Sequence, residues 1–428
     1  MITLAGFYAL LQAADPNLPP VSGMAFYVFT AIKMLIVFTV YMIGVALLTL
    51  AERKISAWIQ DRHGPNRVGK GWGQPFADGL KNIMKEETMP AGVNKPLFVL
   101  APILSFIPAL TAWCVIPFGA PLPTRWGRID MVVADLPVGF LFILAMTSVS
   151  VYGIVIAGWS SNNKYALLGG LRSSAQMVSY EISMGMATIP VLLLAGNVSL
   201  NSIINQQAWG GWNVVNLTVA FFIFMVAAFA ETNRLPFDLP EAESELIAGY
   251  HTEYSAMKFS LFFISEYASM VTASALMATL FFGGWDVPFT SHDNIGPYSG
   301  WLTLLSVGIF LLKILFFLFL FMWIRWTLPR FRYDQLMSLG WKFMLPLALA
   351  YIVLIAAVML GLSAAGFQPG MMYATILGAL NVALVIILFA ILDRGRIISP
   401  AYGRMHPREI ERMRQVTRRA QLAAEANR

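Results

Sequence analysis

The chain has 428 residues, of which 58% are apolar and only 12% are charged. Because a soluble domain carries about a quarter charged residues, this composition indicates that much of the surface faces lipid. The single cysteine, Cys114, excludes an internal disulfide, and an iron–sulfur cluster takes about four cysteine ligands. The four histidines are far apart and show no metal-ligand spacing. We therefore expect no metal and no cofactor bound by this chain alone, and electrons for any redox reaction would come from a partner protein.

Nine apolar segments are long enough to form membrane helices, since crossing the hydrocarbon core takes roughly 20 apolar residues. They predict an all-α fold, a polytopic membrane helix bundle. The predicted spans, in chain order, are approximately 26–50, 97–118, 133–157, 177–196, 212–231, 259–284, 300–325, 343–363 and 371–392.

The basic residues lie mostly on one side of these spans. Of the 29 Lys and Arg residues, 25 fall in segments that share one side. Since basic loops stay in the cytoplasm, we predict a multi-pass protein of the bacterial cytoplasmic (inner) membrane with its C-terminus in the cytoplasm. The formal charge of +6 reflects this asymmetry, and no nucleic-acid partner is expected. The predicted organisation is a membrane bundle, 1–392, followed by a basic cytoplasmic tail, 393–428, with charged cytoplasmic loops at 51–96, 158–176, 232–258 and 325–342.

The first cytoplasmic loop mixes both signs of charge and then predicts a surface helix at about 74–87. Pro75 suits the first turn of that helix. One apolar face suits the membrane interface, although a surface helix without a ligand fits the pattern as well. The residues of this face are Trp72, Phe76, Leu80, Ile83 and Met84.

The third cytoplasmic loop is unusually acidic, with six carboxylates within 23 residues. Such a cluster can hold and pass protons near neutral pH. The alternative is a solvated acidic loop, or one that docks a basic partner. The six are Glu231, Asp238, Glu241, Glu243, Glu245 and Glu253.

Charged residues also fall within the predicted spans. Glu181 and Glu266 lie near the cytoplasmic ends of the fourth and sixth spans, and Glu231 closes the fifth. Because an ionised side chain in lipid costs about 3 kcal/mol or more, these acids are expected to face an internal hydrated route. The alternative is a helix-packing hydrogen bond from a protonated Glu. Lys313, deep in the seventh span, is expected to pair with an acidic or polar group.

Three stretches resemble the quinone-site membrane subunit of NADH-quinone oxidoreductase, the respiratory complex I. They are Glu52–Gly69, Gly158–Glu181 and Glu231–Leu246. The resemblance covers about residues 20–365. Beyond it, a ninth span and the basic tail depart from the family pattern. The tail is predicted to be a short basic helix that binds anionic lipid or a neighbouring protein of the complex.

The resemblance implies eight family-type spans and a place at the heel of the membrane arm. The chain would be a non-autonomous part of a proton-translocating NADH:quinone oxidoreductase, with no catalytic residue of its own. The substrate would be a quinone, and ubiquinone is the one we expect. The quinone cavity would involve Arg53, Trp58, Asp61 and Arg62. Proton coupling would involve Glu181, Glu231, Asp238, Glu241, Glu243, Glu245 and Glu266.

The resemblance also implies partners. They are hydrophilic subunits at the quinone site, one carrying the terminal iron–sulfur cluster, together with small and antiporter-like membrane subunits. Iron–sulfur clusters and FMN would lie in these partners. Membrane lipid would surround the chain. Two rival hypotheses remain. The chain could be the homologous component of a membrane-bound hydrogenase or formate-linked complex, or it could be a self-standing secondary transporter. Against the transporter, the sequence shows no internal repeat of the kind common in such proteins.

Overall fold

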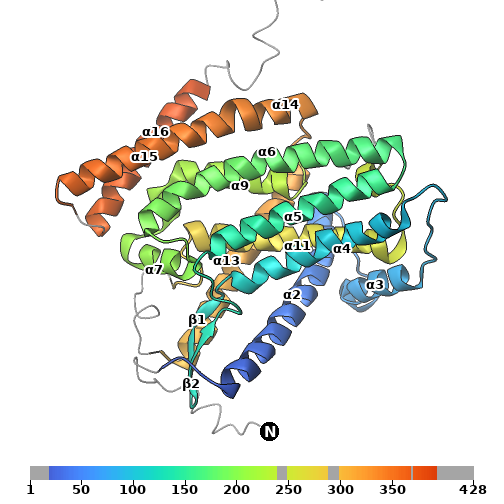
Figure 1. Ribbon diagram of the computed structural model, residues 1–428, viewed down its shortest axis with the longest axis horizontal. Coiled ribbons are helices and arrows are strands. Elements are labelled where there is room, and N and C mark those ends of the chain that lie inside the picture. Colours follow the sequence, from blue (N-terminus) through green and yellow to red (C-terminus); the bar gives the residue numbers. More distant parts are fainter. Residues whose placement is uncertain (1–18, 239–247, 288–297, 368–369, 393–428) are drawn as a thin grey trace, which may run out of the picture.

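The computed structural model describes residues 19–238, 248–287, 298–367 and 370–392, and these form a bundle of long helices (Figure 1). Within these ranges seven helical segments are long and apolar enough to cross a membrane, and two shorter apolar helices accompany them. Each predicted span overlaps one of the nine, which confirms the all-α polytopic bundle. The long segments are α2 (Met24–Ile59), α4 (Lys95–Thr111, extended by a 3-10 turn to Val115), α5 (Gly139–Ser160), α6 (Lys164–Ala195), α11 (Ala256–Phe281), α13 (Gly300–Thr327) and the run of α14 (Tyr333–Ser338), a π-helical segment (Leu339–Met344) and α15 (Leu345–Ala364). The shorter apolar helices are α9 (Thr218–Glu231) and the part Met372–Leu388 of α16 (Met371–Leu392).

The predicted start of the fourth span is wrong, because α6 begins at Lys164 and not near 177. Asn163 caps the helix by accepting a hydrogen bond from the Tyr165 amide at 2.9 Å. The polar residues that follow lower the hydropathy of the sequence, but they do not interrupt the helix. Two of them, Ser173 and Gln176, are fully buried against the rest of the bundle. Glu181 therefore lies in the middle of α6, roughly 26 Å from its start at 1.5 Å per residue.

Glycines allow α5 and α6 to pack closely at their shared end. A Cβ atom at Gly158 would lie 2.7 Å from the Ala166 carbonyl oxygen and 3.3 Å from the Gly170 Cα atom. Small residues at helix interfaces are the usual means of close approach in membranes. The predicted loop 158–176 is therefore mostly helix, interrupted only by the turn at 161–163.

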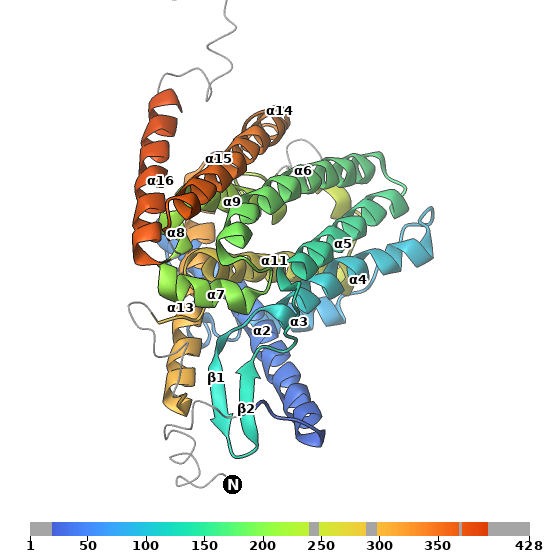
Figure 2. The same ribbon diagram turned by 60° about the vertical axis from the view of Figure 1, so that its left-hand side comes forward.

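A short antiparallel hairpin between α4 and α5 is absent from the sequence-based prediction. It pairs β1 (Gly119–Thr124) with β2 (Gly127–Met131). Lys33 of α2 donates to the Asp130 and Val132 carbonyls at 3.0 and 2.8 Å. On the opposite side, Ser306 of α13 accepts from the Ala120 amide at 2.8 Å. The hairpin is thus held between α2 and α13 (Figure 2).

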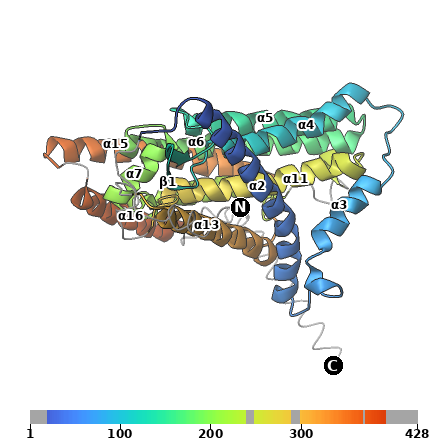
Figure 3. The same ribbon diagram turned by 90° about the horizontal axis from the view of Figure 1, so that it is seen from below.

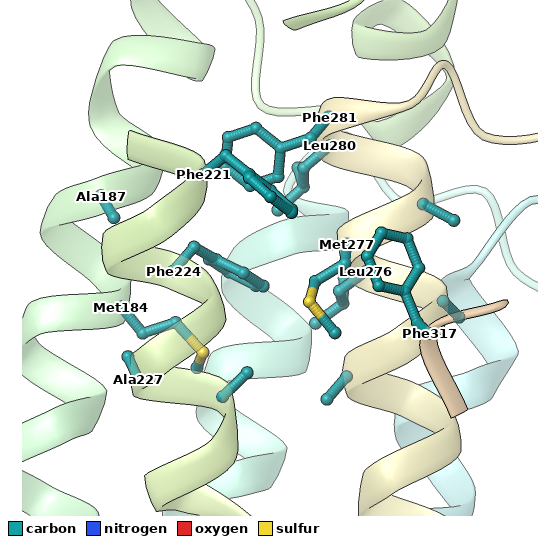
Figure 4. Packing of buried hydrophobic residues seen from close by; sticks show 14 of the residues in the cluster. Met184, Ala187, Phe221, Phe224, Ala227, Leu276, Met277, Leu280, Phe281 and Phe317 are labelled. Atoms are coloured by element: carbon teal, nitrogen blue, oxygen red, sulfur yellow. The ribbon is translucent and has the colours of Figure 1, made fainter. Parts of the chain in front are cut away.

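The core of the bundle surrounds α11, the most deeply buried of the long helices. Aromatic rings from three helices meet there (Figure 4), and the Phe221 ring lies edge-on to that of Phe281 with centroids 5.4 Å apart. Phe317 of α13 contacts the same cluster, with its centroid 6.3 Å from that of Phe221. Alanines on α11, such as Ala275 and Ala278, are fully buried and leave room for these rings.

The surface helix predicted after α2 is confirmed as α3 (Gln74–Met84), with Pro75 in its first turn. Its apolar face is exposed throughout, and Phe76 is 86% exposed. Two further short helices lie on the opposite side of the bundle, α7 (Leu200–Gly210) and α8 (Asn213–Asn216). Seen from below, α2, α3 and α11 converge on one region of the bundle (Figure 3).

Candidate functional site

Five charged and polar side chains from four separate segments meet inside the bundle, and we call them the charged centre. Glu52 comes from α2, Glu266 and Tyr267 from α11, Arg325 from the end of α13, and Arg234 from the segment after α9. Glu52 and Arg234 are only 6% and 4% exposed. Two carboxylates face two guanidinium groups, so the formal charges balance, as buried ions require.

Glu52 connects three of the other members. Its Oε1 atom accepts from Arg325 and lies 3.5 Å from an Arg234 nitrogen. Its Oε2 atom accepts from the Tyr267 hydroxyl at 2.5 Å. An acid near the C-terminal end of α2 can remain buried because these donors compensate for the water it has lost.

Arg234, like Glu52, contacts three of the other members. Its Nε atom lies 2.6 Å from Glu266 Oε1, and its Cζ atom lies 4.2 Å from the centroid of the Tyr267 ring. Gln176 of α6 holds the neighbouring backbone by donating to the carbonyls of Ala230 and Phe237 at 2.8 and 2.7 Å.

A second group of acids lies between α5, α6 and α9. Glu181 accepts from the Ser148 hydroxyl. Glu231 is close enough to Glu181 to interact electrostatically and faces the Thr147 hydroxyl. Glu181 and Glu231 thus form one pair, whereas Glu266 belongs to the charged centre. Asp238, a further predicted site residue, binds Arg330 with an oxygen–nitrogen distance of 3.3 Å.

A cavity of about 480 Å³ opens beside the charged centre, between α2, α3, α11 and α13. Glu52, Tyr267 and Arg325 form part of its wall. Most of the remaining wall is apolar, with Phe263 and Ile83 among its residues. This combination of an apolar interior with a few polar groups is typical of a site for an organic ligand.

The four residues expected at a quinone cavity divide into two groups. Arg53 lines the cavity and binds Asp78 of α3 at 2.8 Å. Trp58 is 66% exposed near the end of α2. Asp61 and Arg62 lie exposed in the turn that follows, outside the cavity wall. The predicted coupling residues Glu241, Glu243 and Glu245 lie outside the described residues.

Lys313 has polar partners, as the sequence leads us to expect. Its Nζ atom donates to the carbonyls of Phe282, Gly284 and Asp286 at 2.7, 2.8 and 2.9 Å. These carbonyls follow the C-terminal end of α11, where the helix dipole favours a cation. The Trp212 ring lies 5.2 Å from the same ammonium group.

Sequence reasoning does not single out Glu52, Tyr267 or Arg325 as site residues. Glu52 and Arg325 each stand at the end of an apolar run, where a charge usually contacts water or lipid headgroups. A tyrosine in a membrane helix is also ordinary in sequence. The one feature of the sequence that could have indicated Tyr267 is its position next to Glu266, because a buried acid needs a hydrogen-bond donor close by.

The fold and the site together define a polytopic membrane protein in which a buried, charge-balanced centre borders a largely apolar cavity. The model of the NADH dehydrogenase family matches residues 32–356 of the chain. The chain therefore belongs to the NADH dehydrogenase family.

Named relatives identify the group within that family. The chain is 53% identical over 338 residues to the H subunit of the NADH-quinone oxidoreductase of Leptospira biflexa serovar Patoc, covering 76% of this chain and 93% of that relative. It is 51% identical over 338 residues to the H subunit of the same enzyme from Salinibacter ruber, covering 77% and 95%. It is also 50% identical over 337 residues to NADH-quinone oxidoreductase subunit 8 of Rhodothermus marinus, covering 77% and 96%. Within the family, the chain groups with these membrane subunits of NADH-quinone oxidoreductase.

Proposed function

We propose that this chain is the quinone-binding, proton-coupling membrane subunit of a multi-subunit NADH:quinone oxidoreductase. The observation that carries the proposal is the cavity whose wall includes Glu52, Tyr267 and Arg325. A quinone has an apolar tail and a polar head, so it needs an apolar passage that ends at hydrogen-bond donors and charges. The names of the relatives favour a quinone enzyme over a hydrogenase-linked complex.

The cavity would receive the quinone, and electrons would arrive from an iron–sulfur cluster of a partner subunit. Reduction to the quinol consumes electrons and an equal number of protons, so negative charge forms briefly in a cavity of low dielectric. Arg325 and Arg234 lie where they would stabilise that charge. Arg53 would stand at the cavity wall, with Trp58, Asp61 and Arg62 outside it, on the surface that faces the hydrophilic partners.

Proton coupling would begin at the charged centre. A new negative charge in the cavity attracts Arg325 and Arg234, which weakens their hold on Glu52 and Glu266. These acids would then take up protons, and the change would pass to Asp238, to Glu241, Glu243 and Glu245, and to the pair Glu181 and Glu231. From there it would reach the antiporter-like partners in the membrane arm.

The proposal includes the placement of the chain. Residues 1–392 would form the membrane domain in the bacterial cytoplasmic membrane, with the tail 393–428 in the cytoplasm. Hydrophilic partners would cover the cytoplasmic face near α3, whose exposed apolar residues and adjacent cavity need shielding from water.

The test uses the assembled complex with Glu231→Gln and Glu266→Gln, made separately. We expect each variant to retain assembly, to reduce quinone more slowly, and to lose proton pumping more strongly than reductase activity. Glu86→Gln, an exposed acid away from the cavity, is the matched control. If both variants pump and reduce as the wild type does, the coupling role is wrong. If a gently purified tagged chain is a lone oligomer, the role as part of a larger complex is itself wrong.

A further inference from the structure

The last two helices, α15 and α16, diverge (Figure 2). An apolar cleft lies between them. The cleft has a volume of about 220 Å³, and its floor is α9. Every residue that lines it is apolar, in contrast to the cavity beside the charged centre. Representative residues are Phe222 and Val226 from α9, Phe343 from the π-helical segment, Leu347 from the start of α15, and Val385 and Leu388 from α16.

A buried polar contact keeps the two helices in this arrangement. The Tyr351 hydroxyl of α15 donates to Asn381 Oδ1 at 2.6 Å, and Asn381 Nδ2 donates to the Asn216 carbonyl at 2.6 Å. Asn381 is fully buried. Because an unsatisfied polar group inside the membrane is costly, α16 cannot easily move to close the cleft.

One wall of the cleft lies beyond the part of the chain that is similar to the family. The family match ends at residue 356, whereas Val385 and Leu388 belong to α16. The cleft is therefore a feature of the C-terminal extension and is separate from the proposed quinone cavity.

The size of the cleft limits its occupant. A purely apolar space of about 150 Å³ stays dry and takes up small hydrocarbons. The cleft, at about 220 Å³ and with an apolar lining throughout, is large enough for a segment of a lipid acyl chain.

Basic residues adjacent in sequence to the walls of the cleft favour an anionic headgroup. Trp341 and Lys342 are exposed in the π-helical segment that also supplies Phe343 to the cleft wall. The sequence that follows α16, 393–428, contains nine arginines and four acidic residues. A basic segment next to a membrane helix attracts anionic lipid by about 1 kcal/mol per charge near the surface.

We propose that the cleft between α9, α15 and α16 binds one acyl chain of an anionic phospholipid whose headgroup lies beside Lys342. The extension thereby adds a lipid site to the membrane domain. This inference does not depend on quinone binding.

The test uses the purified full-length chain in vesicles that contain phosphatidylglycerol with a photoreactive group on one acyl chain. After irradiation, we expect labelled peptides from α9 and α16 that contain Val226 and Leu388. The same acyl chain carried on phosphatidylcholine should label these peptides at least fivefold less. This comparison of headgroups needs no variant, so it is independent of any folding defect.

Val226→Phe fills the cleft and should reduce its labelling at least fivefold. Val353→Phe is the matched control, because Val353 lies on α15 and is 70% exposed away from the cleft. Undiminished labelling in Val226→Phe, or equal labelling by the two headgroups, would overturn the proposal. Loss of labelling in the assembled complex would also overturn it, since a partner protein would then cover the cleft.

Discussion

Arg234 lies over the ring of Tyr267, with its Cζ atom 4.2 Å from the ring centroid. A guanidinium group on an aromatic face keeps its edge free for carboxylates. Arg234 uses this edge for Glu266 at 2.6 Å and Glu52 at 3.5 Å. The stacking therefore determines which two acids the arginine joins.

Arg234→Gln should destabilise the chain strongly. It leaves two buried carboxylates with one cation fewer, and breaking a buried ion pair from one side costs about 3–5 kcal/mol. Arg234→Lys should lose less, since it keeps the charge but not the planar edge. Thermal unfolding in detergent checks the order, with the exposed Arg67→Gln as control. Equal stability of Arg234→Gln and the control would contradict the role of the charged centre.

Tyr267→Phe removes one donor and keeps the ring beneath Arg234. Because a hydrogen bond to a charged group contributes about 1.5–3 kcal/mol, we expect a moderate loss of stability. Quinone reductase activity in the assembled complex should fall through kcat, since Glu52 would lose the hydroxyl that orients it. If both the stability and the activity were unchanged, the 2.5 Å hydrogen bond from Tyr267 to Glu52 would contribute to neither.

Lys313→Met should be more disruptive than Lys33→Met. Lys313 satisfies three carbonyls and is 8% exposed, whereas the partly buried Lys33 satisfies two. Each buried acceptor left unsatisfied costs about 1–3 kcal/mol. We expect Lys313→Met to lower the unfolding temperature clearly further. The reverse order would show that the contact at the end of α11 adds little.

His251 makes the stability of the segment before α11 depend on pH. Burial lowers the pKa of His251 to about 4, against about 6.5 in an unfolded chain. The unfolded state thus binds more protons between these values, so stability is complete above about pH 6.5 and falls as the pH drops toward 4. Between pH 7 and pH 5 the loss amounts to about 2 kcal/mol.

His251→Phe should remove that component of the pH dependence. The aromatic replacement suits the site, where the His251 ring lies 5.3 Å from that of Phe259. Unfolding temperatures at pH 7 and pH 5 are the measurement. An unchanged difference between the two pH values would mean that other groups are responsible.

The fold can be predicted from sequence because each apolar run is long enough to need only its own backbone hydrogen bonds. The boundaries are less predictable. Gln176 looks like a loop residue, yet it is buried where Ala230 of α9 and Phe237 supply carbonyls that accept from it. A polar residue can lie inside a membrane helix when a distant segment supplies its hydrogen-bond partner. The hydropathy of the local sequence does not reveal that partner.

The site is partly predictable for the same reason. Glu181, Glu231 and Glu266 stand out as acids in apolar sequence. A similar expected depth in the membrane does not mean, however, that they contact the same side chains. Glu231 faces Glu181, while Glu266 faces Arg234 from a distant segment. Pairing depends on how helices pack, which a single sequence does not specify.

Helix α2 is attached at two heights. Lys33 ties it to the hairpin, and Glu52 ties it to the charged centre. The two residues are separated by roughly 28 Å along the helix axis, close to the thickness of the hydrocarbon core at about 30 Å. The helix is thus anchored near both faces of the bilayer. A lateral displacement at one anchor would therefore tilt α2 and would not translate the whole helix.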